Sequence, residues 1–202
     1  MQLELPPLLA LTPGDLGERD AVALLGRVER AVAGGLEALV LRERLLSERA
    51  FLELGVRLRG IVRILIVHDR VHLAAQLGAD ALQLGFRSLP PSAVGRALPI
   101  GFSAHAQDTA EVRAGADFLL LGPVLRTPSK EGVLEPLGFE GLAAQCARET
   151  RPIWALGGLK PEHVPQVRAS GARGLAVLSG VLGAADPERA ARAYLDAWTR
   201  AR

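Results

Sequence analysis

The chain has 202 residues, of which 49% are apolar, and this is enough to bury the core of one well-packed domain. Its 24 basic and 22 acidic residues nearly cancel and form no long run of like charge, which argues against nucleic acid as a partner. No apolar run approaches the length of about 18 residues that a membrane span needs, and the N-terminus lacks the features of a secretory signal. We therefore expect a single cytoplasmic domain over residues 1–202, with no membrane span.

Eight apolar segments follow one another along the chain and are predicted to be β-strands. They occupy residues 8–12, 34–43, 61–67, 78–87, 99–105, 115–124, 152–158 and 171–180. Four of them share one design, in which a helix-stopping glycine is followed by a small or charged residue and then by a buried strand, as in "GADALQLGFR" and "GADFLLLGPV".

Amphipathic segments separate these strands and are predicted to be helices. Residues 18–32, 109–116 and 186–200 are examples, and in the last of them Asp186 is the expected N-cap, with Pro187 at the first helical position. Apolar strands that alternate with helices indicate a parallel sheet covered by helices. Eight such units favour one compact α/β domain, a closed (β/α)8 TIM barrel, over an open doubly wound sheet, and no G-x-G-x-x-G follows the first strand.

In a barrel of this kind the active site lies where the strands end, so the polar residues there carry the functional interpretation. The seventh and eighth predicted strands end in small residues, namely Gly157, Gly158, Ser179 and Gly180. Backbone N–H groups at such positions, followed by helix N-termini, are typical of a phosphate site. The alternative is that these residues only shape tight turns.

The second and third predicted strands end in charged residues. Arg42 and Arg44 lie on the same side of an extended chain and suit a carboxylate or a phosphate, unless they are solvated or neutralised by Glu43. At the end of the third strand, His68 or Asp69 can reach the mouth of the barrel, whereas Asp69 can equally be an N-cap of the following helix.

The fifth and sixth predicted strands lead into further polar groups. Ser103 and His105 share one face of the fifth strand, and a histidine at this place is a candidate general acid or base, while Asp108 can cap a helix. The loop after the sixth strand alternates hydroxyl groups with cations and suits a second anion, the alternative being a solvated connector. Its residues are Arg126, Thr127, Ser129 and Lys130.

Taken together and in order, these strand ends resemble the thiamine phosphate synthase family and its relatives, the TenI-type thiazole tautomerases. The matching pieces span nearly the whole chain and are "LRER", "HDRVHLA", "GADALQLG", "FSAH", "GADFLLLGPVLRTPSK", "ALGGLKPEH" and "GLAVLSGV". Singly none of them is specific, but the ordered set is.

One activity that the resemblance implies is the synthase reaction. It joins a pyrimidine methyl diphosphate to a thiazole phosphate and releases pyrophosphate, with Mg²⁺ held at two acidic positions that correspond here to Asp69 and Ser88. This chain therefore lacks the second carboxylate. It also departs from the synthase pattern at Val40, Arg44, His68, Gln83 and Phe86, where the family has Gln, Lys, Asn, His and Gln. Pro123, Thr127, Ser129 and Lys130 match the loop that grips the diphosphate.

The other implied activity is the tautomerase reaction, which aromatises a carboxylated thiazole phosphate by proton transfer and needs neither metal nor cofactor. Tautomerase-like members share the "RER", the Gln at position 83 and the Ser at position 88, so the first half of the chain is more similar to them. Their catalytic His corresponds to Pro123, which has no proton to give. His105 or His68 is then the expected acid or base.

Three hypotheses follow from this pattern. The leading one is a tautomerase-like protein without a cofactor that binds a small phosphorylated thiazole, with Gln83 and Ser103 among its binding residues. The alternatives are a thiamine phosphate synthase with Mg²⁺ on Asp69, and a catalytically silent regulatory protein that keeps the phosphate site. The single Cys146 is expected in a helix as a core or half-buried residue, and a homo-oligomer is left open.

Overall fold

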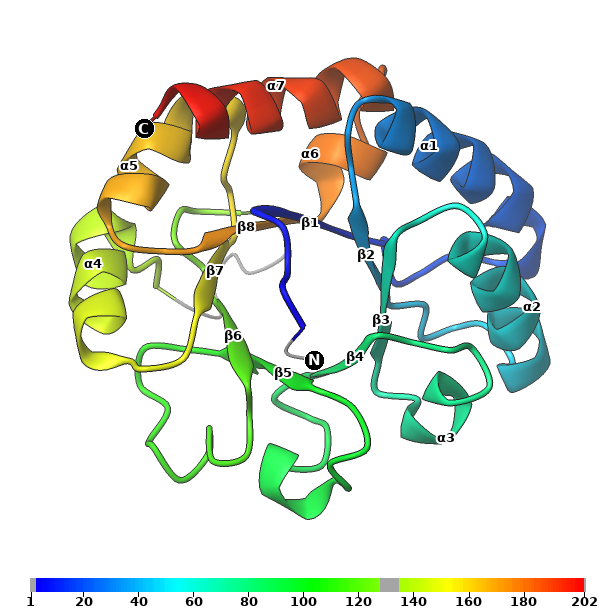
Figure 1. Ribbon diagram of the computed structural model, residues 1–202, viewed down its shortest axis with the longest axis horizontal. Helices are drawn as coiled ribbons and strands as arrows, with labels where there is room; N and C mark the ends of the chain where they lie inside the picture. Colours follow the sequence, from blue (N-terminus) through cyan, green and yellow to red (C-terminus); the bar gives the residue numbers. More distant parts are fainter. Residues whose placement is uncertain (1–2, 128–134, 202) are drawn as a thin grey trace.

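The computed structural model describes residues 3–127 and 135–201, and these form a closed barrel of eight parallel strands (Figure 1). Each strand pairs with the next along the chain, and β1 pairs with β8 to close the ring. The strands are β1 Leu8–Leu11, β2 Ala38–Leu41, β3 Ile64–His68, β4 Ala81–Leu84, β5 Ile100–Ala104, β6 Phe118–Leu121, β7 Ile153–Leu156 and β8 Gly174–Val177. The predicted TIM barrel is therefore confirmed, with all eight strands in the expected segments.

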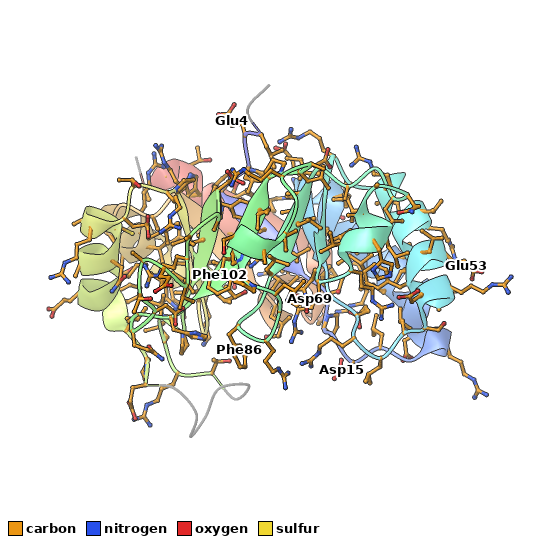
Figure 2. All side chains as sticks on the ribbon, turned by 90° about the horizontal axis from the view of Figure 1, so that it is seen from below. Glu4, Asp15, Glu53, Asp69, Phe86 and Phe102 are labelled. Atoms are coloured by element: carbon orange, nitrogen blue, oxygen red, sulfur yellow. The ribbon has the colours of Figure 1, made fainter. Side chains whose placement is uncertain are left out.

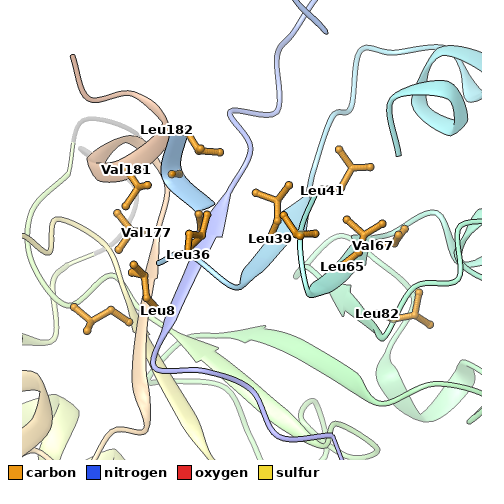
Figure 3. Close-up of a cluster of buried hydrophobic side chains, with 14 of the residues drawn as sticks. Leu8, Leu36, Leu39, Leu41, Leu65, Val67, Leu82, Val177, Val181 and Leu182 are labelled. Atoms are coloured by element: carbon orange, nitrogen blue, oxygen red, sulfur yellow. The ribbon is translucent and has the colours of Figure 1, made fainter. Parts of the chain in front are cut away.

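Alternate residues of each strand build two separate cores. Leu9, Ile64 and Phe118 belong to the cluster inside the barrel, whereas Leu8 and Leu65 belong to the cluster between the strands and the helices. Figure 3 shows leucines and valines of this outer cluster side by side on neighbouring strands. Because both faces are buried, the strands read as continuous apolar runs instead of alternating with polar residues.

Helices cover most of the outside of the barrel (Figure 1). The α-helices are α1 Ala21–Ala33, α2 Glu48–Arg59, α3 Val71–Ala74, α4 Gly138–Arg148, α5 Val164–Ala169, α6 Ser179–Leu182 and α7 Pro187–Arg200, and short 3₁₀ turns span Glu18–Asp20, Pro91–Ala93 and Pro161–His163. Helix α7 begins as predicted, since the side chain of Asp186 accepts a hydrogen bond from the N–H of Arg189 and Pro187 is the first helical residue. Cys146 lies half-buried in α4, as expected.

The predicted helix over residues 109–116 is wrong. This stretch forms turns in the structure, so the connection from β5 to β6 contains no α-helix. The segment is too short to stabilise a helix by itself, and it ends at Gly115, whose φ of 87° is left-handed. Val112 is exposed and Arg113 is buried, which reverses the arrangement that an amphipathic helix requires.

A glycine turn before each of these four strands is confirmed by the backbone, although the stretch before Gly115 is not helical. Gly35, Gly78, Gly115 and Gly171 all have positive φ, and each lies three residues before the first residue of its strand, β2, β4, β6 or β8. Residues with a Cβ seldom adopt this conformation, so glycine is the residue that turns the chain into each of these strands.

The two ends of the barrel differ. The N-terminal segment crosses one end, where Leu3 and Leu5 pack against the inner core and the indole N–H of Trp154 donates to the carbonyl of Pro6 at 2.9 Å. In Figure 2, Glu4 lies at this end, and Phe86 and Asp15 lie at the opposite end, where the strands finish. Among the helices of residues 3–127 and 135–201, none has the length and low polarity that a bilayer span needs.

Candidate active site

Three neighbouring strands contribute a polar layer to the inside of the barrel mouth. His68, Gln83 and Ser103 each lie two residues beyond an inward-facing position of β3, β4 and β5, namely Ile66, Ala81 and Gly101. The amide Nε2 of Gln83 donates to Ser103 Oγ at 3.0 Å, and the side chain is completely buried. The structure therefore brings together two predicted binding residues whose distance the sequence left open.

The buried amide of Gln83 is only partly satisfied. Its Nε2 also donates to the carbonyl of Leu84 at 3.2 Å, whereas its Oε1 has no hydrogen-bond partner within the described parts of the chain. That oxygen lies against Gly101, where a Cβ would be only 2.3 Å away from it. Glycine at position 101 thus makes the room in which the amide sits.

Asp69 faces the barrel mouth and does not cap a helix. Its φ of 63° is left-handed, and Arg70, not Asp69, is the N-cap residue of α3. The carboxylate accepts a hydrogen bond from the hydroxyl of Ser88, and its other oxygen is 3.1 Å from Nδ1 of His68. The sequence left open whether Asp69 reaches the mouth or caps the helix, and these contacts place it at the mouth. They also tie the end of β3 to the loop after β4.

The surroundings of Asp69 favour its ionised form. Burial acts to raise the pKa of the carboxyl, but hydrogen bonds from His68 and Ser88 outweigh this and hold the pKa below its ordinary value. The side chain is 44% exposed, so the charge remains accessible from the mouth of the barrel.

A Mg²⁺ ion would find one carboxylate here. Among the described residues, no three His, Cys, Asp or Glu side chains are grouped as metal ligands. Mg²⁺ commonly uses one or two carboxylates and completes its shell with water and substrate phosphates. Asp69 and the hydroxyl of Ser88 therefore fit a Mg²⁺ ion that arrives with a diphosphate.

The two arginines after β2 lie at the rim, where they donate to the loop after β1. Arg42 Nη1 donates to the carbonyl of Pro13 at 2.9 Å, and Arg44 Nε donates to that of Gly14 at 3.3 Å. Burial lowers the pKa of Arg42, and the neighbouring charge of Arg44 lowers it further. Both cations thus share one side of the mouth, as predicted.

Glu43 has a structural role that the sequence analysis did not identify. It is 1% exposed, and its two carboxylate oxygens accept the N–H groups of Gly14 and Leu16, each at 3.0 Å. Glu43 therefore binds the loop after β1 to the end of β2, and its negative charge also acts to raise the pKa of Arg42, against the larger effect of burial. A carboxylate between two arginines directly after an apolar strand was the available signal.

His105 lies at the end of β5 with a side chain that is 13% exposed. Its backbone N–H donates to Oδ2 of Asp108 at 2.7 Å, and its Nδ1 is 3.7 Å from the same oxygen. Asp108 therefore caps no helix and instead fixes the turn that carries His105. The edge of the Phe86 ring approaches the imidazole, with ring centroids 5.9 Å apart.

The hydroxyl of Tyr194 contacts both the segment after β7 and the segment after β8. It donates to the carbonyl of Leu159 at 2.8 Å, and a Cβ on Gly180 would lie 2.4 Å from the same oxygen. Burial raises the pKa of Tyr194 to about 12, so the hydroxyl stays protonated and remains a donor. No pattern in the sequence pointed to this tyrosine, which is 35 residues from Leu159.

Gly157 and Gly158 have φ values of 103° and 67°, and a Cβ on either would collide with residues 123–126. Their N–H groups have no backbone or side-chain acceptor in the described residues, while Ser179 and Gly180 open helix α6. Tight packing accounts for the glycines, and the open N–H groups leave an anion site available.

The predicted anion-binding loop after β6 is described only in part. Thr127 lies in the described chain, whereas Ser129 and Lys130 fall outside the described residues.

Comparison with known proteins identifies the family. A sequence profile described as thiamine monophosphate synthase matches residues 10–181, which is most of the chain. The chain belongs to the thiamine monophosphate synthase family. This confirms the resemblance that the strand ends indicated, at the level of the family.

Individual members of the thiamine monophosphate synthase family are similar over most of their length. The thiamine-phosphate synthase of Moorella thermoacetica is 39% identical over 185 residues, which cover 87% of this chain and 88% of that protein. The thiamine-phosphate synthase of Thermus thermophilus is 40% identical over 181 residues, covering 85% and 87%. The solved thiamine phosphate pyrophosphorylase from Pyrococcus furiosus has a TM-score of 0.83 and 28% identity, with 96% of each chain covered. These names favour the synthase alternative over the tautomerase that the sequence analysis placed first.

A buried ionic network outside the barrel holds the chain segment that carries His105. Arg113 is 5% exposed and donates from Nη2 to the carbonyl of His105 at 2.6 Å and from Nη1 to Glu149 at 3.4 Å. Glu149 also pairs with Arg151 at 2.7 Å. Hydrogen bonds from Arg151 lower the pKa of Glu149 from 4.5 to about 2.

Replacing Glu149 with Gln should destabilise the fold in a pH-dependent way. Because the folded-state pKa is depressed, the ionised carboxylate stabilises the protein above about pH 4.5, and this contribution is lost as the pH falls through about 2. We expect the free energy of unfolding to fall by roughly 2–3 kcal/mol at pH 7. Urea denaturation at several pH values measures this difference, which should shrink steadily below about pH 4.5.

The exposed Glu29 on α1 provides the matched control, and Glu29→Gln should change the free energy of unfolding by less than about 0.5 kcal/mol. Equal stability of the parent and Glu149→Gln at pH 7 would show that the network does not stabilise the fold.

Proposed function

We propose that this protein is a thiamine-phosphate synthase, which joins a hydroxymethylpyrimidine diphosphate to a thiazole phosphate. In this reaction the bond between the pyrimidine methylene and the diphosphate oxygen breaks, its electron pair leaves with the diphosphate, and the thiazole nitrogen bonds to the methylene carbon. The observation that carries the proposal is the carboxylate of Asp69 at the barrel mouth, bonded to Ser88 and His68, in a family whose relatives with this name are about 40% identical.

The chain's own residues would bind and orient the diphosphate. Asp69 with Ser88 would hold Mg²⁺, which when bound neutralises the charge of the leaving diphosphate. Arg42 and Arg44 supply positive charge on the neighbouring strand end, and Thr127 begins the loop that matches the diphosphate grip of the family. Ser129 and Lys130 of the same loop belong to this proposal through the sequence resemblance alone.

The thiazole phosphate would occupy the opposite side of the mouth, after β7 and β8. Support comes from the N–H groups of Gly157 and Gly158, which have no acceptor in the described residues, and from the start of α6 at Ser179 and Gly180. The hydroxyl of Tyr194 bonds the carbonyl of Leu159 and lies close to Gly180, so one side chain contacts both loops. Backbone N–H groups that are fixed in advance bind a phosphate without paying to order it.

A second candidate is the tautomerase reaction, and one observation favours it. The hydroxyl of Ser88 replaces a carboxylate and is bonded to Asp69, whose other oxygen holds Nδ1 of His68. Because Nδ1 of His68 faces Asp69, Nε2 is the ring nitrogen left to accept a proton. His105 is a second imidazole at the same mouth. Pro123 still takes the place of the usual catalytic His.

Mg²⁺ dependence tests the two reactions together. With hydroxymethylpyrimidine diphosphate, thiazole phosphate and Mg²⁺, we expect thiamine phosphate, and removal of divalent ions should lower its rate at least about a hundredfold because the leaving charge is no longer neutralised. Binding of thiazole phosphate should change by less than about twofold on the same treatment, since its site uses backbone N–H groups.

The competing outcomes of this assay are distinct. Aromatic thiazole formed without Mg²⁺, in the absence of thiamine phosphate, would replace the synthase by the tautomerase. Binding of thiazole phosphate with no product from either substrate set would indicate a silent binding protein.

The histidines are tested with the tautomerase substrate. If the chain aromatises the thiazole, His105→Gln should lower turnover about a hundredfold while binding of thiazole phosphate stays within about twofold. Unchanged turnover in this variant would move the proton transfer to His68, for which His68→Gln is the matched change. Unchanged turnover in both would exclude either histidine as the base.

The phosphate site is tested at Gly158. Gly158→Ala would place a Cβ 2.5 Å from the carbonyl oxygen of Arg126 at a φ of 67°, so the backbone must shift. We expect the affinity for inorganic phosphate and thiazole phosphate to fall at least about tenfold by calorimetry. Gly26→Ala in α1, where a Cβ meets nothing within 4 Å, is the control and should bind as the parent does. Equal affinity of Gly158→Ala and the parent would contradict the site.

A further inference from the structure

Phe86 is the exposed aromatic residue of a protein that otherwise buries its aromatic rings. The chain has five phenylalanines, two tryptophans and one tyrosine, all within the described residues. Four of these rings are completely or almost completely buried in strands or helices, Tyr194 is buried beneath the two phosphate loops, and Phe139 and Trp198 pack against the core. Phe86 is 61% exposed and lies at the end of the barrel where the strands finish (Figure 2).

A hydrogen-bonded turn holds Phe86 in this place. The N–H of Ser88 donates to the carbonyl of Gly85 at 3.0 Å, and the N–H of Gly85 donates to the hydroxyl oxygen of Ser88 at 2.6 Å. Phe86 and Arg87 are therefore the two central residues of the turn. Because the same hydroxyl donates to Asp69, the turn that presents Phe86 is fixed to the carboxylate proposed to meet the diphosphate.

The neighbours of the ring show what it can bind. The guanidinium of Arg87 lies 5.4 Å from the centroid of Phe86, so the π face already attracts a planar cation. The ring edge approaches His105 at an interplanar angle of 70°. An exposed ring that lies beside an imidazole, on a turn bonded to a carboxylate at the mouth of a barrel, is placed to contact a flat ligand.

We propose that Phe86 stacks on the pyrimidine ring of the diphosphate substrate and selects for it. The inference rests on the proposed function, because a diphosphate near Asp69 brings the ring attached to it, one methylene away, to the turn of residues 85–88. Departure of the diphosphate leaves positive charge on the pyrimidine methylene, and the face of an aromatic ring attracts such charge. The thiazole phosphate, held after β7 and β8, makes no use of Phe86.

Calorimetry with the whole protein and Mg²⁺ tests this without turnover, using hydroxymethylpyrimidine diphosphate and thiazole phosphate separately. Phe86→Ala should weaken the pyrimidine ligand about tenfold, and Phe86→Leu, which keeps apolar area without a π face, should also weaken it several-fold. Phe86→Tyr should stay within about twofold of the parent, as should thiazole phosphate with every variant. Leu89→Ala, a change at the 64% exposed apolar residue of the same loop, is the control and should bind both ligands normally.

Equal binding of the pyrimidine ligand by the parent and Phe86→Ala would overturn the inference, as would equal weakening of both ligands or no pyrimidine binding by the parent. The proposed function fails separately. A parent that binds the pyrimidine ligand through Phe86 but makes no thiamine phosphate would exclude the synthase and keep the stacking role. A parent that makes thiamine phosphate, but binds the pyrimidine ligand equally well with and without the Phe86 ring, would keep the synthase and exclude the stacking role.

Discussion

The pairing of β1 with β8 is the constraint on which the rest of the structure depends. Leu9 aligns with Ala176 across this seam, and the closed ring brings the carboxyl ends of all eight strands to one rim. Only this closure places His68 of β3 and the loops after β7 and β8 around a common opening. An open sheet of the same strands would spread these groups along an edge.

Contacts between neighbouring loops then fix the rim. Glu43 binds the loop after β1, Ser88 joins the loop after β4 to Asp69, and Tyr194 joins the loops after β7 and β8. In each case a polar side chain of one unit hydrogen-bonds a group of another, so the chain itself holds these described parts of the rim in place. Such preorganisation lowers the entropy that binding must otherwise remove.

The strands were predictable because each depends on residues close together in the sequence. Eight apolar runs, four of them preceded by a glycine, identified all eight strands. Ser103 was named from its strand end and Gln83 from the family resemblance, and the structure shows that the two side chains are hydrogen-bonded. The helix over residues 109–116 was predicted wrongly because Arg113 turns inward to the carbonyl of His105, a contact that depends on α4. The role of Tyr194 depends on packing across distant segments in the same way.

The orientation of Asp69 could not be predicted from its neighbours in the sequence. A residue two positions before a helix is compatible with capping, and only the left-handed φ and the hydroxyl of Ser88 decide otherwise. Ser88 is ambiguous in the same way, because the resemblance assigns a hydroxyl at this position to tautomerase-like proteins, and yet this hydroxyl bonds Asp69. Relatives about 40% identical over most of the chain are named synthases and favour that reaction.

The segment before β1 determines from which end a ligand can approach the barrel. Leu3 and Leu5 cover the barrel at the end opposite the candidate active site, and the bond from Trp154 to Pro6 holds the segment there. Because this end is covered and the interior is filled by side chains, a ligand can reach the polar residues only from the rim where the strands finish. In the proposed synthase reaction both substrates would arrive at that rim and both products would leave from it, so the order in which the products depart would govern when the next pair of substrates can bind.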